Sequence, residues 1–272
     1  MKNFLKRMIS NKVINFLKKI LPYKKNLILK KLKFDYISDI IYLGSDYGGW
    51  SFLNDSNLEK NFIISAGLGE DASFDLELIN RYNCKVIVVD PTPRAIEHYK
   101  KIIENSGKGR SEHYKKGGKQ NISSYNLSNI NDDNYILISK ALYNLDNEET
   151  KFYSPPNKDH VSYSLSNWQS NYRKNTDFIK IKTITVKNIL NKFDIKNLEM
   201  IKLDIEGAEL DVIKNMFDNN IFPKQILVEF DELNIISKTS IDRFFYIHRE
   251  ILSHKYKLIK TSSKFPDFLY IK

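Results

Sequence analysis

The chain has 272 residues, of which 42% are hydrophobic and 28% are charged, a composition typical of a globular protein with a sizeable core. Its one cysteine, Cys84, excludes an intrachain disulfide and a cysteine-based zinc site, and favours a reducing cytoplasm. The net charge of +10 suggests a nucleic-acid partner at first, but residues 1–33 hold eleven Lys or Arg residues and no acid. The rest of the sequence is almost neutral, so a nucleic-acid partner is not expected.

The basic arm, residues 1–33, is predicted to contain an amphipathic helix that ends near Pro22. Its apolar stripe has helical spacing and consists of Leu5, Ile9, Val13, Phe16 and Ile20. Basic residues interrupt every apolar run of the arm, so neither a secretory signal nor a membrane span is expected there. The helix either lies on an anionic membrane surface, which would place the protein at the inner membrane face, or packs on its own domain.

The elements of the main domain, residues 34–272, begin with residues 40–50, whose tandem glycines indicate a tight turn before Trp50, a residue expected to pack or to cover a ligand. From residue 61 onward, short apolar runs alternate with amphipathic helical patterns. In chain order we predict a strand at 62–66, a helix at 71–82, a strand at 85–89, a helix at 94–104, strands at 135–139 and 200–203, a helix at 208–219, and strands at 225–230, 257–260 and 268–271. This order is typical of an α/β fold with a doubly wound, mostly parallel sheet and a terminal antiparallel hairpin.

Two stretches of the main domain depart from this alternation. Residues 105–134 are rich in Gly, Ser, Asn and Lys, and we predict a flexible, exposed insertion there. Residues 142–186 contain Pro155 and Pro156 and are predicted to form an inserted β-rich lobe. Such a lobe would lie near the mouth of the sheet, on the substrate side.

Acidic residues follow three of the predicted strands. The first strand runs into a glycine turn, Gly67 to Asp71, the second ends at Asp90, and a later one ends at Asp204, shortly before Glu206. Ligands of open parallel sheets bind beyond the carboxyl ends of the strands, near the point where the strand order reverses. These side chains should therefore line one crevice.

Two cofactors fit a glycine turn of this kind. The turn matches the dinucleotide pattern GxGxxA, with an acid twenty-one residues after Gly69, which allows a nicotinamide-dependent oxidoreductase. A pyrophosphate, however, would be repelled by Glu70 and Asp71, whereas the sulfonium and ammonium groups of S-adenosylmethionine suit an acidic rim. Asp90 can accept hydrogen bonds from ribose hydroxyls in either case. The acidic turn favours S-adenosylmethionine.

Three motifs resemble those of the FkbM-family methyltransferases: FIISAGLGEDASF at 62–74, VDPTP at 89–93 and IKLDIEGAE at 201–209. LVEF at 227–230 and the segment 159–165 are also similar to this family, in particular to its branch with Asp-Pro-Thr-Pro after the second strand. The resemblance implies a seven-stranded class I methyltransferase fold of the Rossmann-like type. It also implies methyl transfer from S-adenosylmethionine to a hydroxyl of a carbohydrate or natural product.

The resemblance identifies the cofactor turn and the ribose-binding acid. With their polar neighbours they give a cofactor site of seven residues: Gly67, Gly69, Glu70, Asp71, Ser73, Asp90 and Thr92. A sugar hydroxyl is a weak nucleophile, so a general base or a metal should assist its deprotonation. Asp204 is the first candidate, as the base or as a ligand, with Glu229, of a divalent cation such as Mg²⁺. Glu206 is a further catalytic candidate, and His160 in the inserted lobe is the alternative base.

A third class of function is a non-catalytic adaptor that keeps the fold and docks at a membrane or a partner through the basic arm. The acids at all three strand ends argue against it, because a scaffold has no need of them.

Overall fold

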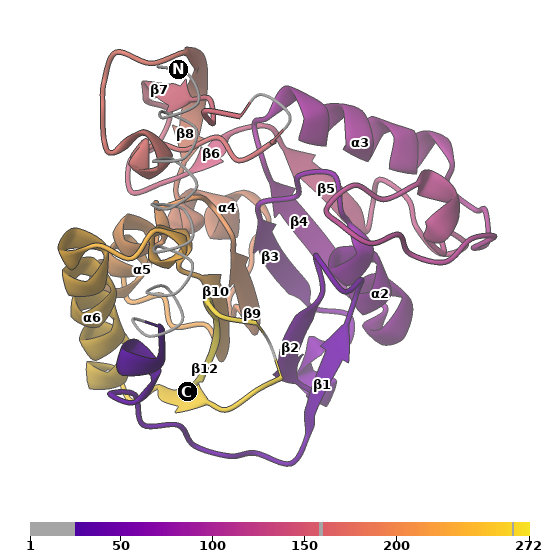
Figure 1. The fold of residues 1–272 in the computed structure, drawn as a ribbon. Helices are drawn as coiled ribbons and strands as arrows, with labels where there is room; N and C mark the ends of the chain where they lie inside the picture. The colour runs from indigo at the N-terminus through magenta and orange to yellow at the C-terminus, as the bar shows by residue number, and fades with distance from the viewer. Residues whose placement is uncertain (1–24, 158–159, 263) are drawn as a thin grey trace, which may run out of the picture.

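Seven strands form the central sheet of the computed structural model, which describes residues 25–157, 160–262 and 264–272. Their order across the sheet is β11-β12-β10-β9-β3-β4-β5 (Figure 1). The bounds are Phe62–Ala66 for β3, Lys85–Val89 for β4, Tyr135–Ile138 for β5, Met200–Leu203 for β9, Gln225–Glu229 for β10, Lys257–Ile259 for β11 and Asp267–Ile271 for β12. The strand β12 is antiparallel to both neighbours, and the other paired strands are parallel. The predicted fold class is confirmed, with β12 one place in from the edge of the sheet.

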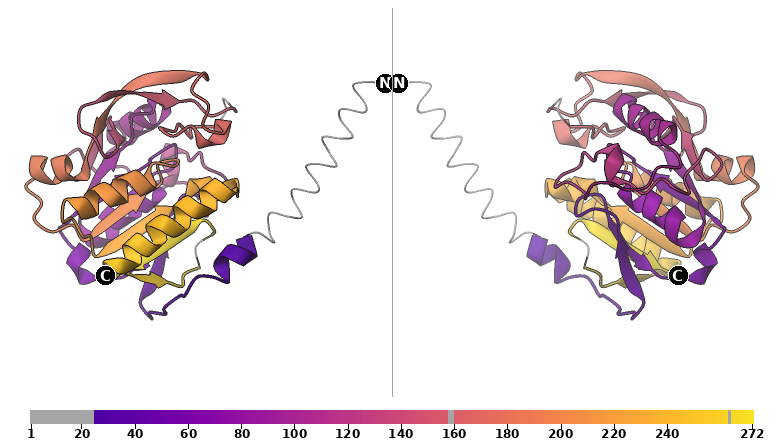
Figure 2. Two further views of the ribbon diagram at one scale, coloured as in Figure 1. Left: turned by 90° about the vertical axis from the view of Figure 1, so that its left-hand side faces the viewer. Right: turned by 90° about the vertical axis from the view of Figure 1, so that its right-hand side faces the viewer.

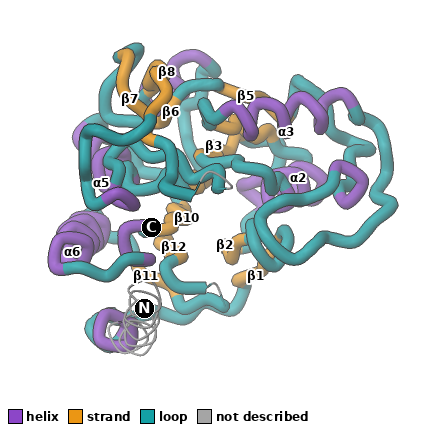
Figure 3. Tube along the Cα trace, turned by 45° about the horizontal axis from the view of Figure 1, so that its top comes forward, coloured by secondary structure: helices purple, strands orange, loops and turns teal. Residues whose placement is uncertain are grey.

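Helices cover both faces of this sheet. Figure 3 shows α2 and α3 on one side of the strands and α5 and α6 on the other. The bounds are Ser73–Tyr82 for α2, Pro93–Glu104 for α3, Val186–Lys192 for α4, Glu209–Asp218 for α5 and Lys238–Ser253 for α6. Single 3₁₀ turns are formed by Ser56–Leu58, Ile122–Ser124, Trp168–Ser170 and Asp231–Asn234. Successive strand residues alternate between two cores, so that Ile64 and Ile201 pack towards α4, α5 and α6, and Ile63 and Met200 pack towards α2 and α3.

A β-hairpin precedes the sheet in sequence and packs beside β10. Its strands, β1 (Ile40–Leu43) and β2 (Trp50–Leu53), are antiparallel. The buried Gln225 side chain fixes the hairpin to the sheet, because it accepts the Leu53 N–H at 2.8 Å and donates to the Leu53 carbonyl at 3.0 Å. Trp50 is 4% exposed and belongs to a core cluster, so it packs and does not cover a ligand.

The predicted insertion, residues 105–134, is exposed only in part. Tyr125 and Leu127 are each 1% exposed and Ile130 is 2% exposed, and all three belong to the core on the α2 and α3 side. The Tyr125 hydroxyl accepts the Ala72 N–H at 3.0 Å and lies 2.9 Å from His98 Nε2. The expectation of an exposed segment is therefore wrong for its second half, because apolar and aromatic residues are interspersed among the polar ones and anchor it.

The predicted lobe, residues 142–186, contains most of a small three-stranded sheet. Its order is β6-β8-β7, with β6 at Ala141–Leu142, β7 at Glu149–Tyr153 and β8 at Phe178–Ile184. Figure 1 shows this sheet at the top of the molecule, above α4, α5 and α6 and level with α3, and Figure 2 shows it at the top in both views. The lobe contributes Phe152, Val161 and Tyr163 to the cavity at the carboxyl ends of the parallel strands, and its role on the substrate side stays a prediction.

The predicted amphipathic helix of the basic arm falls largely on residues 1–24, which lie outside the described residues. Residues 25–29 are helical, and the arm contacts the domain through Ile28 and Leu32, which are 3% and 9% exposed. Among the described residues, no helix combines the length and the apolar character needed to cross a membrane.

Candidate active site

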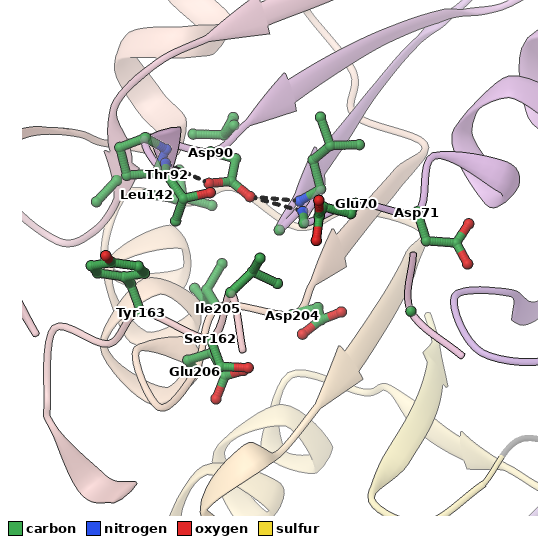
Figure 4. A pocket seen from close by; sticks show the side chains of 18 of the residues that line it. Glu70, Asp71, Asp90, Thr92, Leu142, Ser162, Tyr163, Asp204, Ile205 and Glu206 are labelled. Atoms are coloured by element: carbon green, nitrogen blue, oxygen red, sulfur yellow. Dashed lines mark hydrogen bonds between the residues drawn. The ribbon is translucent and has the colours of Figure 1, made fainter. Parts of the chain in front are cut away.

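A cavity of about 880 Å³, partly open to solvent, lies at the carboxyl ends of β3, β4 and β9. The chain passes from β3 outward to β4 and β5 and later returns to β9 on the other side of β3, so the cavity lies where the strand order reverses. Figure 4 shows Leu142 and Tyr163 at one end of the cavity, Asp71 at the other and Asp90 between them. The cavity therefore has an apolar end and an acidic end.

The glycine turn after β3 allows the backbone of two strands to approach closely. Gly67 has a φ of +88°, and a Cβ atom there would lie 1.9 Å from the carbonyl oxygen of Asp204. Gly69 has a φ of +55° and lines the cavity opposite Val161. At Gly67 both the close approach and the φ require glycine, whereas Gly69 has a left-handed φ that favours glycine but leaves room for a Cβ atom.

Asp90 organises this turn from the end of β4. Its Oδ2 accepts the N–H groups of Leu68 and Gly69 at 2.9 and 3.1 Å, and its Oδ1 accepts the N–H of Thr92 at 2.8 Å (Figure 4). The residue is 5% exposed and lines the cavity. A carboxylate has about four acceptor positions, and three are used here, so Asp90 can still accept one hydrogen bond from a ribose hydroxyl.

The two acids of the turn have different surroundings from those that the sequence suggests. Glu70 pairs with Arg94 and, at 3.2 Å, with Lys119, so its charge is neutralised within the protein. Asp71 accepts hydrogen bonds from Ser45 Oγ at 2.5 Å and from Gln120 Nε2 at 3.3 Å. Both acids line the cavity, but their carboxylates mainly brace the surrounding loops.

The two predicted hydroxyl residues lie in different places. Thr92 lines the cavity, and its Oγ1 caps α3 by accepting the Ala95 N–H at 3.4 Å. Ser73 is fully buried, and its Oγ accepts the Ser45 N–H at 2.7 Å. The structure thus places Ser73 behind the cavity wall, in contrast to the predicted contact with a cofactor.

A strained turn after β9 carries the next two acids. Asp204 and Glu206 both line the cavity, and Glu206 has a φ of +56°, which is unusual for a residue with a side chain. The turn is held by Asp231, which accepts the Glu206 N–H at 3.0 Å, and by Ser164, which donates to the Glu206 carbonyl at 2.6 Å. Glu209 accepts the N–H groups at 205 and 207, so it shapes the turn.

A cluster of carboxyl groups includes Asp204, which lines the cavity, and also Glu229 and Asp231, which do not line it. Carboxylate oxygens of Asp204, Glu229 and Asp231 lie within 4.8 Å of one another. Burial, followed by the charges of neighbouring acids, raises the pKa of Glu229 to about 9 and that of Glu206 to about 7. Burial also raises the pKa of Asp204, and Asp90 adds to this effect while Lys202 opposes it. The cluster can hold protons at neutral pH, or it can hold a cation.

The structure does not bring the alternative base, His160, to the cavity. Its side chain is exposed, whereas Ser162 and Tyr163, two and three residues further on, line the cavity. The sequence could not give this orientation, because a loop has no fixed periodicity from which the direction of a side chain follows.

Several residues of the site were not predicted. Asp231 belongs to the acidic cluster. The sequence offers one signal for it, because Asp231 follows Glu229 by two residues at the end of a predicted strand. Phe152 and Tyr163 have ring centroids 5.6 Å apart at the apolar end of the cavity. Tyr47 lines the cavity from the hairpin turn. Nothing local in the sequence marks Phe152 or Tyr47, whereas Tyr163 belongs to the segment 159–165, whose resemblance to the family was the available signal.

Comparison with known protein families matches residues 52–258 to the methyltransferase FkbM domain. A comparison with curated proteins finds no match. The matched range covers well over half of the chain and includes the glycine turn, Asp90 and the acids after β9. The chain therefore belongs to the FkbM methyltransferase family.

Proposed function

We propose that this methyltransferase uses S-adenosylmethionine to methylate a hydroxyl oxygen of a sugar, a glycan or a related small molecule. The observation that carries the proposal is the order of groups along the cavity. Leu142 and Tyr163 form an apolar end, Asp90 follows, and Asp204 supplies a carboxylate beyond it, while Glu206 lines the cavity beside Ser162 (Figure 4). The adenine, the ribose diol and the cationic sulfonium of S-adenosylmethionine have the matching order. The residues present therefore fit this cofactor.

The N–H groups around the glycine turn argue against the alternative, a nicotinamide dinucleotide. A dinucleotide places its pyrophosphate on free N–H groups of this turn and of the following helix N-terminus. Here the N–H groups of Leu68 and Gly69 donate to Asp90, that of Ala72 donates to Tyr125 Oη, and that of Ser73 donates to Asp71. Four of the N–H groups that could face a pyrophosphate are therefore already engaged.

Asp204 is the residue that we expect to deprotonate the acceptor. When bound, S-adenosylmethionine supplies the methyl group, and the protein must align the hydroxyl and remove its proton. Asp204 lines the cavity, and desolvation there raises its pKa, which makes its carboxylate more basic than that of an aspartate on the open surface. Glu206 has a pKa of about 7 and can pass the proton on to solvent.

The acidic cluster also supports a divalent-cation site as a second element of the proposal. Oxygen ligands from Asp204, Glu229 and Asp231 suit Mg²⁺ or Ca²⁺. If such an ion binds, Mg²⁺ or Ca²⁺ should raise Tm and EDTA should reverse the effect. Glu229→Gln should abolish the shift, whereas Glu149→Gln, at an exposed position in the lobe, should leave it unchanged. An equal shift in both variants would refute the site.

The cofactor is tested by calorimetric titration with S-adenosylmethionine and, separately, with NAD. We expect saturable binding of S-adenosylmethionine alone. Binding of NAD in its place would refute the proposal. For the acceptor, Asp204→Asn should retain cofactor binding but lose transfer of labelled methyl groups to a panel of sugars and glycans. Normal transfer by Asp204→Asn would exclude this residue as the base.

The basic arm supports a location at an anionic membrane surface. Its last segment, residues 25–33, contacts the domain near the loop before β12, where Lys25 Nζ lies 5.0 Å from the Phe265 ring centroid. This loop leads to Asp267, whose pKa is raised to about 7 by burial and by the charge of Asp204. The last segment of the arm thus lies near Asp267, which interacts electrostatically with Asp204 in the cavity lining.

Vesicle sedimentation tests this location. Deletion of residues 1–24 should release the protein from vesicles that contain phosphatidylglycerol and leave S-adenosylmethionine binding intact. Vesicle binding that is unchanged by the deletion would refute membrane docking through the arm.

A further inference from the structure

Tyr47 lines the cavity from the turn between β1 and β2. Ser45 holds this turn, because its N–H donates to Ser73 Oγ at 2.7 Å and its hydroxyl donates to Asp71 at 2.5 Å. The same hydroxyl accepts the N–H groups of Tyr47 and Gly48 at 3.2 and 3.0 Å. The backbone of Tyr47 is therefore fixed relative to the glycine turn, although 68% of the residue is exposed.

The ring of Tyr47 rests on Gly118, which belongs to the insertion 105–134. A Cβ atom at Gly118 would lie 2.4 Å from ring atom Cε1, 2.7 Å from Cζ and 2.9 Å from Cδ1 of Tyr47. Gln120 ties the same loop to the glycine turn, since its Nε2 donates to Asp71 at 3.3 Å. Two segments that are distant in sequence thus meet at Asp71 and place the tyrosine ring between them.

The ring borders the acidic end of the cavity. Gly48 and Gly118, which contact or adjoin Tyr47, line this cavity together with Asp204 and Glu206. Partial desolvation raises the pKa of the Tyr47 hydroxyl, and the charges of Asp204, Glu229 and Glu206 raise it further. A cation in this part of the cavity is therefore attracted by carboxylates and has an aromatic ring beside it. Tyrosine rings attract cations through the negative potential of their faces.

We propose that Tyr47 is a further cofactor-binding residue, whose ring, positioned by Gly118, contacts the sulfonium group of S-adenosylmethionine. The contact favours the charged cofactor over its uncharged product, S-adenosylhomocysteine, and so promotes exchange of product for cofactor after each turnover. This inference rests on the proposed function, because it assumes that S-adenosylmethionine occupies the cavity.

Two substitutions remove the ring from the site in independent ways. Tyr47→Leu replaces the aromatic ring by an aliphatic side chain. Gly118→Ala leaves Tyr47 in the sequence but displaces its ring, because the added methyl group would overlap ring atoms. Gly118 is not among the glycines with positive φ, and the exposed ring can move, so the alanine should not strain the backbone. Tyr47→Phe keeps the ring and removes only the hydroxyl.

The measurement is the calorimetric Kd of each variant for S-adenosylmethionine and for S-adenosylhomocysteine. Tyr47→Leu and Gly118→Ala should weaken S-adenosylmethionine binding by about fivefold to tenfold and S-adenosylhomocysteine binding by less than about twofold. Tyr47→Phe should stay within about twofold of wild type for both ligands. Tyr36→Leu is the matched control, since Tyr36 is 81% exposed and outside the cavity lining, and it should change neither Kd.

Equal weakening for both ligands, or none, would overturn the inference while leaving the proposed function intact. A loss in Tyr47→Phe as large as that in Tyr47→Leu would also overturn it, because the hydroxyl would then be the group that binds. If the wild-type protein binds neither ligand, the proposed function fails and this inference fails with it. Thermal unfolding of each variant verifies that the fold is retained.

Discussion

Asp90→Asn is the sharpest single test of the cofactor site, because it keeps the shape of the side chain and removes one acceptor. In the structure, Oδ2 faces the N–H groups of Leu68 and Gly69 at 2.9 and 3.1 Å, and Oδ1 faces that of Thr92 at 2.8 Å. An asparagine can turn its carbonyl oxygen towards only one of these two sides. Its NH₂ group then meets an N–H donor on the other side.

The size of the effect follows from these contacts. A buried donor left without an acceptor costs about 1–3 kcal/mol. We therefore expect Asp90→Asn to lower the free energy of unfolding by about 2 kcal/mol and Tm by roughly 5 °C. A ribose diol would also lose a charged acceptor, and a similar loss of about 2 kcal/mol corresponds to a Kd for S-adenosylmethionine roughly 30-fold higher.

The assay combines thermal unfolding with calorimetric titration of S-adenosylmethionine. Asp132→Asn is the control, because Asp132 is exposed on the surface and should show neither effect. If Asp90→Asn unfolds and binds like the wild type, the carboxylate neither shapes the turn nor binds ribose, and the assignment is wrong. A lower Tm with unchanged affinity would restrict Asp90 to a structural role.

Three further predictions follow from single contacts. Gly67→Ala should destabilise the protein by more than about 3 kcal/mol in urea unfolding, because the new Cβ would lie 1.9 Å from the Asp204 carbonyl oxygen; an effect below about 1 kcal/mol would contradict the turn geometry. Burial and like charge raise the pKa of Glu229 from 4.5 to about 9, so the native state retains a proton that the unfolded chain releases, and unfolding free energy should fall as pH rises from about 5 to about 9. A rise over this range in urea titrations would be the opposite result. Tyr125→Phe removes the hydroxyl that bonds two buried partners, and it should cost about 1–2 kcal/mol, whereas no loss would mean that the insertion is not anchored there.

The strands β3, β4 and β9 could be predicted from the sequence because each is a short, mostly apolar run followed by a glycine or an acid. The bounds of β3 and β4 agree with those predicted, as do those of β9. In a sheet covered on both faces, nearly every side chain of β3, β4 and β9 after the first residue is buried, so these strands show as apolar runs rather than as an alternation. The acids that follow these strands could be predicted to lie close together, because the carboxyl ends of parallel strands meet at one edge of the sheet.

Other parts of the structure depend on contacts that no local pattern records. Arg94 and Lys119 come from two different segments, and each forms an ion pair with Glu70. These ion pairs give Glu70 a structural role in place of the predicted contact with the cofactor. The helix α6 was not predicted. Its capping box uses serine at both Ser237 and Ser240, where glutamate or glutamine usually marks the third helical position. Aromatic residues also interrupt its polar face, as the exposed Tyr246 illustrates.

The acidic end of the cavity connects the binding of the cofactor to the chemistry proposed for it. Carboxyl groups that are buried together cost free energy unless they are protonated or paired with positive charge. Lys202 lies 3.8 Å from Asp204, but its ammonium group also donates to the Gly67 carbonyl at 2.5 Å, so it serves the glycine turn as well. A sulfonium cation beside Asp204 and Glu206 would supply the missing positive charge and lower their pKa values. Cofactor binding would thus deprotonate Asp204 before this base accepts the proton of the acceptor hydroxyl. Transfer of the methyl group would remove the positive charge of the sulfur and so weaken the binding of S-adenosylhomocysteine.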